Sequence, residues 1–144
     1  MLSAQQQLHN NTVYPLLNRF LKEGWITQRV AEGERGQTRL VYELTAEGRR
    51  YLAGRLAQFT EAEAGNDDAF RLRVGLFDLL GIGARGRILE LRDRRLAEQL
   101  ERMRQIAAAH KTMSSWPKET FDFTVASLER EREWIAGLLS RLES

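Results

Sequence analysis

The residues whose types could do chemistry together lie in the stretch 11–23, where polar and basic side chains share one face of an amphipathic helix. At about 100° per residue, a helical wheel gathers them on one front, made of Asn11, Pro15, Asn18 and Lys22, with Thr12 and Arg19 on its flank. Asparagine can pair with base edges, arginine with guanine or phosphate, and lysine with phosphate. Such a front suits the major groove of DNA, although a polar front is also what an ordinary solvated surface helix carries.

The back of the same stretch is apolar. Its residues follow the i, i+3, i+4, i+7, i+8 pattern of a helix: Val13, Leu16, Leu17, Phe20 and Leu21. The pattern predicts a helix over residues 12–23 that ends at Gly24. Before it, residues 2–9 favour a short helix with Ser3 as N-cap, and Asn10 with Asn11 favours a turn.

After Gly24 the apolar period changes from 3.6 to 2, which predicts strands over residues 25–30 and 38–44. The connecting stretch 31–37 is polar, contains Gly33 and Gly36, and makes a hairpin tip. Four polar side chains on and beside this tip could reach a flanking minor groove or the DNA backbone: Arg35, Gln37, Thr38 and Arg39. Thr45 is then expected to cap a helix whose apolar stripe contains Leu52, Leu56 and Phe59.

The remainder of the chain is predicted to be helical. Residues 60–68 are polar and are expected to separate two modules, with Asn66 or Asp67 capping a short helix over 69–80 that Gly81, Gly83 and Gly86 end. Long helices are expected over 87–110 and 118–143, with a turn at Trp116 and Pro117. We therefore predict a mainly α fold, with a winged helix-turn-helix domain over 1–62 and an antiparallel helical dimerisation domain over 67–144.

The two long helices carry heptad-spaced apolar residues. We expect them to dimerise through Leu89, Leu96, Leu100, Met103, Phe121, Val125, Leu128, Ile135, Leu139 and Leu142. Arg132 occupies one seam position, where it either pairs with a Glu or extends to water. An ordinary monomeric helical hairpin is the alternative.

Composition limits the other functions. Of 144 residues none is Cys and two are His, which leaves no thiol chemistry and no His pair at metal-ligand spacing, so no metal or cofactor is expected. No apolar run is long enough to span a membrane, and a cytoplasmic location is expected. No nucleophile–base pair or carboxylate dyad points to an enzyme. The net charge of +2 arises within residues 1–50, which contain seven Lys and Arg and five Asp and Glu.

Two blocks of the sequence resemble the PadR-like transcriptional regulators. Residues 12–26, TVYPLLNRFLKEGWI, resemble the recognition-helix signature of that family, and residues 42–49, YELTAEGR, resemble the end of its wing and the start of its linking helix. Residues 70–77 and the following charged helices are similar to the longer C-terminal domain of the same family. One departure is that only residues 1–10 precede the recognition helix, so the usual first helix is apparently lacking.

The resemblance implies a homodimer that binds double-stranded DNA at a pseudo-palindromic operator, more often as a repressor. It adds Tyr14 to the expected DNA-binding residues. It also implies that a small aromatic effector could bind, in a pocket lined by Trp116, Phe121, Phe123, Trp134 and Phe77. The alternative is a winged-helix protein–protein interaction module without DNA binding, which the low net charge and short N-terminus favour.

Overall fold

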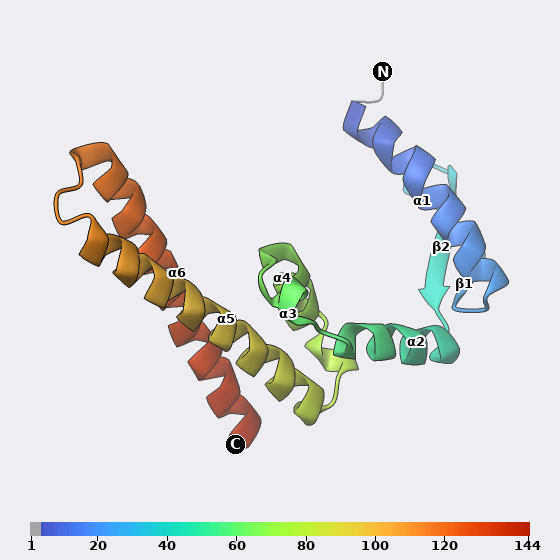
Figure 1. Ribbon diagram of the computed structural model, residues 1–144. Helices are drawn as coiled ribbons and strands as arrows, with labels where there is room; N and C mark the ends of the chain where they lie inside the picture. Colours follow the sequence, from blue (N-terminus) through green and yellow to red (C-terminus); the bar gives the residue numbers. More distant parts are fainter. Residues whose placement is uncertain (1–3) are drawn as a thin grey trace. The chain divides into compact units, whose positions relative to one another are not determined.

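The computed structural model describes the backbone of residues 4–144 and the side chains of residues 13–144 (Figure 1). It forms two compact units, Met1–Arg55 and Leu56–Ser144. The division falls between Arg55 and Leu56, inside a helix. The predicted domains, 1–62 and 67–144, have their boundary further along the chain and stay a prediction.

The first unit contains one helix, one hairpin and the start of a second helix. Helix α1 spans Ala4–Lys22, strands β1 and β2 span Ile26–Glu32 and Thr38–Leu44, and helix α2 begins at Ala46. The strands pair antiparallel, from Ile26 opposite Leu44 to Glu32 opposite Thr38. The predicted hairpin is confirmed, with its second strand at the predicted bounds.

Helix α1 runs without a break through residues 10 and 11, so the predicted turn there is wrong. Pro15 consequently lies inside the helix rather than in its first turn. A proline in the interior removes one backbone hydrogen bond to the carbonyl four residues earlier. Asparagine is a weak helix former but does not by itself end a helix, and here the flanking residues carry the helix through.

Gly24 ends α1 as predicted. The amide of Trp25 donates to the carbonyl of Phe20 at 3.0 Å, and that of Gly24 donates to Leu21 at 3.2 Å. This is the double bond pattern of a Schellman motif, which needs a left-handed residue at the position that Gly24 occupies with φ of 72°.

The second unit is entirely helical. It begins with the last two residues of α2, which spans Ala46–Ala57, and continues through α3 (Glu61–Ala64), α4 (Asp67–Gly75) and the short 3-10 helix η1 (Phe77–Leu79). Two long helices follow, α5 (Ile82–Ala109) and α6 (Ser115–Glu143). The predicted fold class is confirmed: the chain is mainly helical with one small antiparallel sheet.

Several predicted boundaries in this unit are wrong. Helix α5 begins at Ile82, so Gly83 and Gly86 lie within it, and α6 begins at Ser115, so Trp116 and Pro117 lie in its first turn. A glycine inside a helix lowers the stability of the helix by about 1 kcal/mol relative to alanine. Burial of the apolar side chains further along α5 contributes more free energy than this. Proline is tolerated in a first turn because its missing N–H would have had no partner there.

Helices α5 and α6 lie antiparallel and, together with α4, form the apolar core of the unit. Its largest fully buried side chains are Phe70, Ile88, Leu89, Leu96 and Ile135. Between them lie two buried arginines, Arg73 and Arg92, whose side chains are paired with carboxylates and carbonyls. The core of this unit therefore combines apolar packing with a buried ionic network.

Candidate nucleic-acid interface

The predicted DNA-contacting side chains of α1 that the structure describes all lie on an exposed face of the helix. Tyr14 is 53% exposed, and the other four are also exposed: Pro15, Asn18, Arg19 and Lys22. Tyr14, Asn18 and Lys22 follow one another at four-residue intervals and so form one row along the helix. The side chains of Asn11 and Thr12, which belong to the same predicted face, lie outside the described residues.

A compact set of contacts around Thr45 holds the end of α1 against the start of α2. The Thr45 amide donates to the carbonyl of Trp25 at 2.9 Å, and its hydroxyl donates to the carbonyl of Gly24 at 2.7 Å. The same hydroxyl accepts from the amide of Gly48 at 2.9 Å, which is the predicted N-cap. One side chain thus connects the turn after α1 to the first turn of α2.

Gly48 allows the two segments to approach closely. A Cβ at this position would lie 1.9 Å from the carbonyl oxygen of Trp25, a distance that no real side chain adopts. Trp25 in turn stacks on Tyr51 of α2, with ring centroids 3.7 Å apart, and packs against Phe20 at 5.6 Å. These contacts orient α1 relative to the hairpin and to α2.

The hairpin tip is a five-residue connection closed by backbone hydrogen bonds. The amide of Gly33 donates to the carbonyl of Gln37 at 2.7 Å, and that of Gly36 donates to Gly33 at 3.2 Å, with φ of 70° at Gly36. All four predicted side chains of this region are exposed: Arg35, Gln37, Thr38 and Arg39. Glu34 lies next to Arg35, so the tip is polar rather than purely basic.

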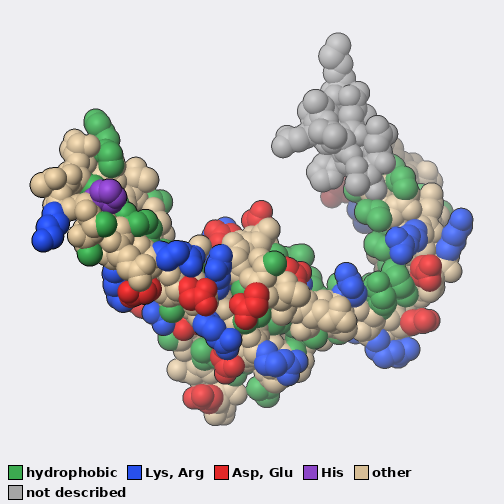
Figure 2. Space-filling view, in the orientation of Figure 1, with side chains coloured by type: hydrophobic (Ala, Val, Ile, Leu, Met, Phe, Trp, Pro, Cys, Tyr) green, Lys and Arg blue, Asp and Glu red, His purple; other side chains and the backbone are tan. Residues whose placement is uncertain are grey.

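The first unit has a moderate positive charge. Residues 1–55 hold eight Lys and Arg against five Asp and Glu. Figure 2 shows Lys and Arg side chains spread over the hairpin and α2 on the face in view, with acidic side chains among them. One of these cations is locally neutralised, because Arg29 donates to Glu43 across the hairpin at 2.9 Å.

The same unit also exposes apolar side chains. Val13 and Leu16 of α1 are 39% and 43% exposed, and Val30 and Leu40 of the hairpin are 66% and 48% exposed. Val30 and Leu40 are paired across the hairpin and so lie side by side. Exposed apolar side chains that adjoin one another are typical of a binding face.

The predicted dimerisation residues fall into two groups. Four are buried within this single chain, namely Leu89, Leu96, Leu100 and Ile135. The other six are half-buried: Met103, Phe121, Val125, Leu128, Leu139 and Leu142. The heptad seam therefore contributes mainly to packing of α5 against α6.

A second apolar stripe on α6 was not singled out from the heptad pattern. Trp116, Phe123 and Trp134 are 82%, 74% and 45% exposed. At 100° per residue they fall within about 20° of one another on the helix, and roughly 140° from the buried seam. Their spacing of seven and eleven residues is the sequence signal that identifies the stripe.

The predicted aromatic pocket is not one cavity. Phe123 and Trp134 line a groove of about 530 Å³ together with Arg71 and Arg130. Phe121 instead lines a separate cavity of about 520 Å³ near His110. Trp116 is largely exposed.

Phe77 is half-buried and lines neither of these two cavities.

The buried arginines of the second unit were also missed. Arg92 donates to both carboxylate oxygens of Glu131, at 2.8 and 3.0 Å, to Asp67 at 2.6 Å, and to the carbonyl of Ala64 at 2.8 Å. Burial lowers the pKa of Arg92, but the hydrogen bonds to Glu131 and Asp67 outweigh it and raise the pKa overall. Arg92 therefore stays charged, and each of its three nitrogens donates a hydrogen bond in the core.

Two chemical possibilities find no support in the part of the chain that the structure describes. Across residues 13–144, no group of three His, Asp or Glu side chains could hold a metal ion. Within the same described part, none of the helices has the length and apolar character needed to cross a lipid bilayer.

The solved structures that match the chain include two of low sequence identity. PadR of Bacillus subtilis in complex with operator DNA is 17% identical, covers 92% of this chain and 78% of that chain, and has a TM-score of 0.46. The smu.1604c protein of Streptococcus mutans UA159 is 19% identical, covers 89% of this chain and 76% of that chain, and also has a TM-score of 0.46. No curated protein matches the chain.

The family comparison concerns the first unit. Residues 2–54 match the sequence model of the Transcriptional regulator PadR-like family. The match contains α1, the hairpin, and α2 as far as its ninth residue. Over residues 2–54 this chain is therefore similar to the PadR-like family of transcriptional regulators.

Proposed function

We propose that the chain is a sequence-specific DNA-binding transcriptional regulator, most simply a repressor, that acts as a homodimer on a pseudo-palindromic operator. The single observation that carries this proposal is the row of exposed polar side chains on α1, comprising Tyr14, Asn18 and Lys22, beside Arg19 and within the family-matched segment. Asn18 and Arg19 carry the groups that read base edges, and Lys22 carries a charge for phosphate.

The hairpin supports the same proposal. Arg35, Arg39 and their polar neighbours are exposed at and beside its tip, where a cation can contact phosphates or enter the minor groove. The Thr45 contacts join α1, the hairpin and α2 into one unit, so the helix and the wing have a fixed geometry toward a duplex.

The exposed aromatic stripe of α6 supports a homodimer. A single copy leaves Trp116 and Phe123 largely uncovered and Trp134 nearly half exposed, and a two-fold contact buries such a stripe on both copies at once. Two copies also present two copies of α1, which raises the affinity for a site with two half-sites.

Selection of bound duplexes from a random-sequence pool tests the proposal directly. The full chain is expected to enrich one pseudo-palindromic sequence, and its affinity for that sequence should fall steeply with salt as phosphate contacts release counterions. The role of repressor is tested by placing the selected sequence at a promoter and measuring transcription with and without the chain. Failure to enrich any sequence at low salt would contradict the proposal.

A second candidate function follows from the exposed apolar side chains of the first unit. Val13, Leu16, Val30 and Leu40 would suit a protein–protein module that keeps the winged fold without binding DNA. Substitution of Leu40 by Asp separates the two functions. A DNA-binding chain should keep its enriched sequence, whereas an interaction module should lose its protein partner and show no DNA affinity in either form.

A further inference from the structure

The groove that Phe123 and Trp134 line lies wholly within the second unit, among residues of α4, α5 and α6. Its volume is about 530 Å³, and Arg71 of α4 and Arg130 of α6 line it as well. Phe123 is 74% exposed and Trp134 is 45% exposed, so a single copy leaves much of the apolar wall open to water. We call this site the α4–α6 groove.

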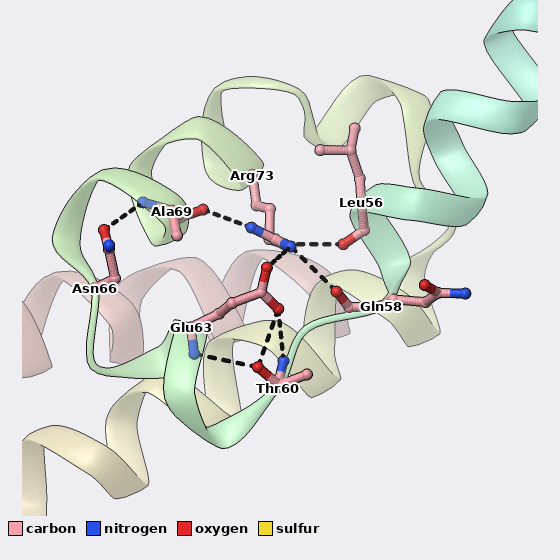
Figure 3. Close-up of polar contacts among 7 residues, drawn as sticks. All are labelled: Leu56, Gln58, Thr60, Glu63, Asn66, Ala69 and Arg73. Carbon is pink, nitrogen blue, oxygen red and sulfur yellow. Dashed lines mark hydrogen bonds and ion pairs between the residues drawn. The ribbon is translucent and has the colours of Figure 1, made fainter.

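The wall that α4 contributes is fixed at both ends of the helix (Figure 3). At its start, Asn66 accepts a hydrogen bond from the amide of Ala69 at 3.0 Å. Toward its end, the buried Arg73 donates to the carbonyl of Gln58 at 3.1 Å and to a carboxylate oxygen of Glu63 at 2.7 Å. Helix α4 is therefore held in place beside the groove.

The three helices around the groove are also tied to one another. Arg92 of α5 donates to Asp67 of α4 at 2.6 Å and to Glu131 of α6 at 2.8 and 3.0 Å, and all three residues line the groove. The ring of Trp134 meets the buried ring of Phe70 edge-on, with centroids 6.1 Å apart. The groove is thus a preformed site with a rigid base.

Trp116 has the most exposed large apolar side chain in the described part of the chain, at 82%. It lies in the first turn of α6, which runs unbroken from Ser115 to Glu143. Trp134 follows 18 residues later, which is five turns or about 27 Å along the same side of the helix. Trp116 therefore cannot reach the groove of its own copy.

A two-fold rotation removes this separation. When two α6 helices pack antiparallel, Trp116 of each copy can lie beside Trp134 of the partner, so the contact forms twice. Phe123, seven residues after Trp116, then lies opposite Ser127 of the partner, seven residues before Trp134. A large side chain faces a small one, so the stripe on α6 is complementary to itself.

The charges on α6 favour the same alignment. Glu119 lies three residues after Trp116, and Arg130 lies four residues before Trp134; both side chains are exposed. With Trp116 beside Trp134 of the partner, Glu119 comes level with Arg130 of the partner and the two charges attract. A two-fold axis placed at Arg130 instead would bring two like charges together.

We propose that Trp116 of a second copy of the chain inserts into the α4–α6 groove, so that each copy supplies one tryptophan and receives one. The inference rests on the homodimer of the proposed function and adds how the two copies meet. Helix α6 packs antiparallel on α6 of the partner, with Glu119 beside the partner's Arg130. The occupant of the groove is therefore the chain itself.

Mixing two variants tests whether Trp116 and the groove meet across copies. Trp116→Ala removes the inserted side chain and leaves the groove open. Ser127→Lys keeps Trp116 but places a long charged side chain in the groove, which Ser127 lines. Both positions are exposed, so the helix content of each variant, followed by circular dichroism, should match that of the wild-type chain.

Each variant alone loses both tryptophan contacts of its homodimer, whereas a mixed dimer keeps one of them. Loss of one buried interface tryptophan typically weakens binding at least about tenfold. The mixed dimer should therefore be at least about tenfold tighter than either homodimer. Native mass spectrometry of an equimolar mixture should show mixed dimers in excess of their statistical share, and no excess would overturn the proposal.

Two further variants serve as controls. Ser140→Lys adds the same side chain at an exposed position of α6, about 140° around the helix from Ser127. Mixed with Trp116→Ala, it should give no excess of mixed dimers. Trp116→Phe keeps an aromatic ring and should weaken the homodimer less than about threefold, compared with at least about tenfold for Trp116→Ala.

Crosslinking tests the direction of the helices with Trp116 in place. Because the sequence contains no Cys, Glu119→Cys/Arg130→Cys has thiols at these two positions only. They lie about 16 Å apart along one α6, but the proposed packing brings them level across copies, at the usual helix separation of about 8–10 Å. A thiol reagent spanning about 10 Å should join the two copies covalently.

Neither single variant should form this covalent dimer, because two copies of the same residue lie about 15 Å or more apart along the helix axis. Absence of a covalent dimer from the double variant, at a concentration where the chain is dimeric, would overturn the proposal. A covalent dimer from Arg130→Cys alone would also overturn it, because that result places the two-fold axis at Arg130.

The outcomes separate this inference from the proposed function, since neither measurement uses DNA. A chain that passes both tests but selects no duplex would contradict DNA binding alone. A dimeric chain that selects a duplex but mixes statistically would overturn this contact alone. A wild-type chain that sediments as a monomer would overturn both the homodimer and the contact.

Discussion

Arg132 of α6 and Asp93 of α5 form a two-bonded ion pair, with Nε 2.7 Å from one carboxylate oxygen and Nη2 3.1 Å from the other. One residue earlier on each helix, Arg92 of α5 donates to both oxygens of Glu131 of α6. In one pair the arginine lies on α6 and the carboxylate on α5, and in the other pair the arrangement is reversed. A slip of either helix by one turn, about 5.4 Å, would break both pairs, so together they specify the register of the antiparallel hairpin.

Asp93→Asn should lower the free energy of unfolding by about 1 kcal/mol, since the hydrogen bond from Arg132 weakens while both side chains remain partly solvated. The pKa of Arg132 is raised by its hydrogen bond to Asp93, which is the same interaction seen from the other partner. Urea unfolding followed by circular dichroism measures the change. Glu129→Gln, on an exposed face of α6, should change it by less than about 0.5 kcal/mol, and an equal effect of the two would argue against the pair.

Gly48→Ala should destabilise the first unit by more than about 2 kcal/mol, because the new Cβ would meet the Trp25 carbonyl oxygen and force α2 away from the turn after α1. Gly54 lies in the same helix with nothing within 4 Å of a Cβ. Gly54→Ala should therefore stabilise the chain by about 0.5–1 kcal/mol. Hydrogen exchange of residues 16–52 distinguishes the two variants, because it should be faster in Gly48→Ala and not in Gly54→Ala. Unchanged exchange in Gly48→Ala would contradict the close contact.

The chain should lose stability in acid partly through Glu63. Hydrogen bonding from the backbone of Thr60 lowers the pKa of Glu63; burial opposes this shift, and Arg73 adds to it. A lowered pKa means that the folded chain binds this proton less readily than the unfolded chain. The stabilisation is therefore present above the ordinary value of 4.5 and is lost as the pH falls from there through the pKa of the folded chain.

Glu63→Gln tests this pH dependence. The variant should be less stable than wild type at pH 7, and the difference between the two should shrink as the pH falls below 4.5. Urea unfolding at a series of pH values measures both curves. A difference that stays constant across the series would exclude a titrating contribution from Glu63.

Phe123→Asp should convert the proposed homodimer to a monomer, because it places a charge in the centre of the exposed aromatic stripe of α6. Analytical ultracentrifugation over a range of concentrations measures the change. Since Phe123 is 74% exposed in the single chain, the fold of each copy should be retained. A wild-type chain that sediments as a monomer at high concentration would refute the dimer. A Phe123→Asp variant that remains dimeric would show that the dimer contact does not lie on this stripe.

The parts of the fold that local chemistry determines could be predicted from the sequence. Gly24 is needed at a left-handed position, Thr45 and Asn66 cap their helices as expected, and the alternation over 38–44 predicts β2. Each of these features depends on a few neighbouring residues. The exposed row on α1 that contains Asn18 and Lys22 is a further such feature, because a helical wheel is enough to place these residues on one face.

The parts that depend on tertiary contacts could not be predicted. Gly83 and Gly86 suggest a break, but α5 continues through them because its next turn packs Ile88 and Leu89 into the core. Arg73 and Arg92 look like surface charges, although each occupies an apolar-stripe position between buried residues. Helix α3 was missed even though Thr60 and Glu63 have capping-box spacing, because four residues are too few for a periodic pattern.

The central claim is that the outward row of α1 reads DNA sequence, and the ratio of affinities for the selected and a scrambled duplex tests it most directly. Asn18→Ala/Arg19→Ala should reduce this ratio at least about tenfold, since each lost base contact is worth roughly 1–3 kcal/mol. Arg104→Ala removes an exposed charge from the second unit and should leave the ratio unchanged. An undiminished ratio in the Asn18/Arg19 variant would contradict the assignment of this face.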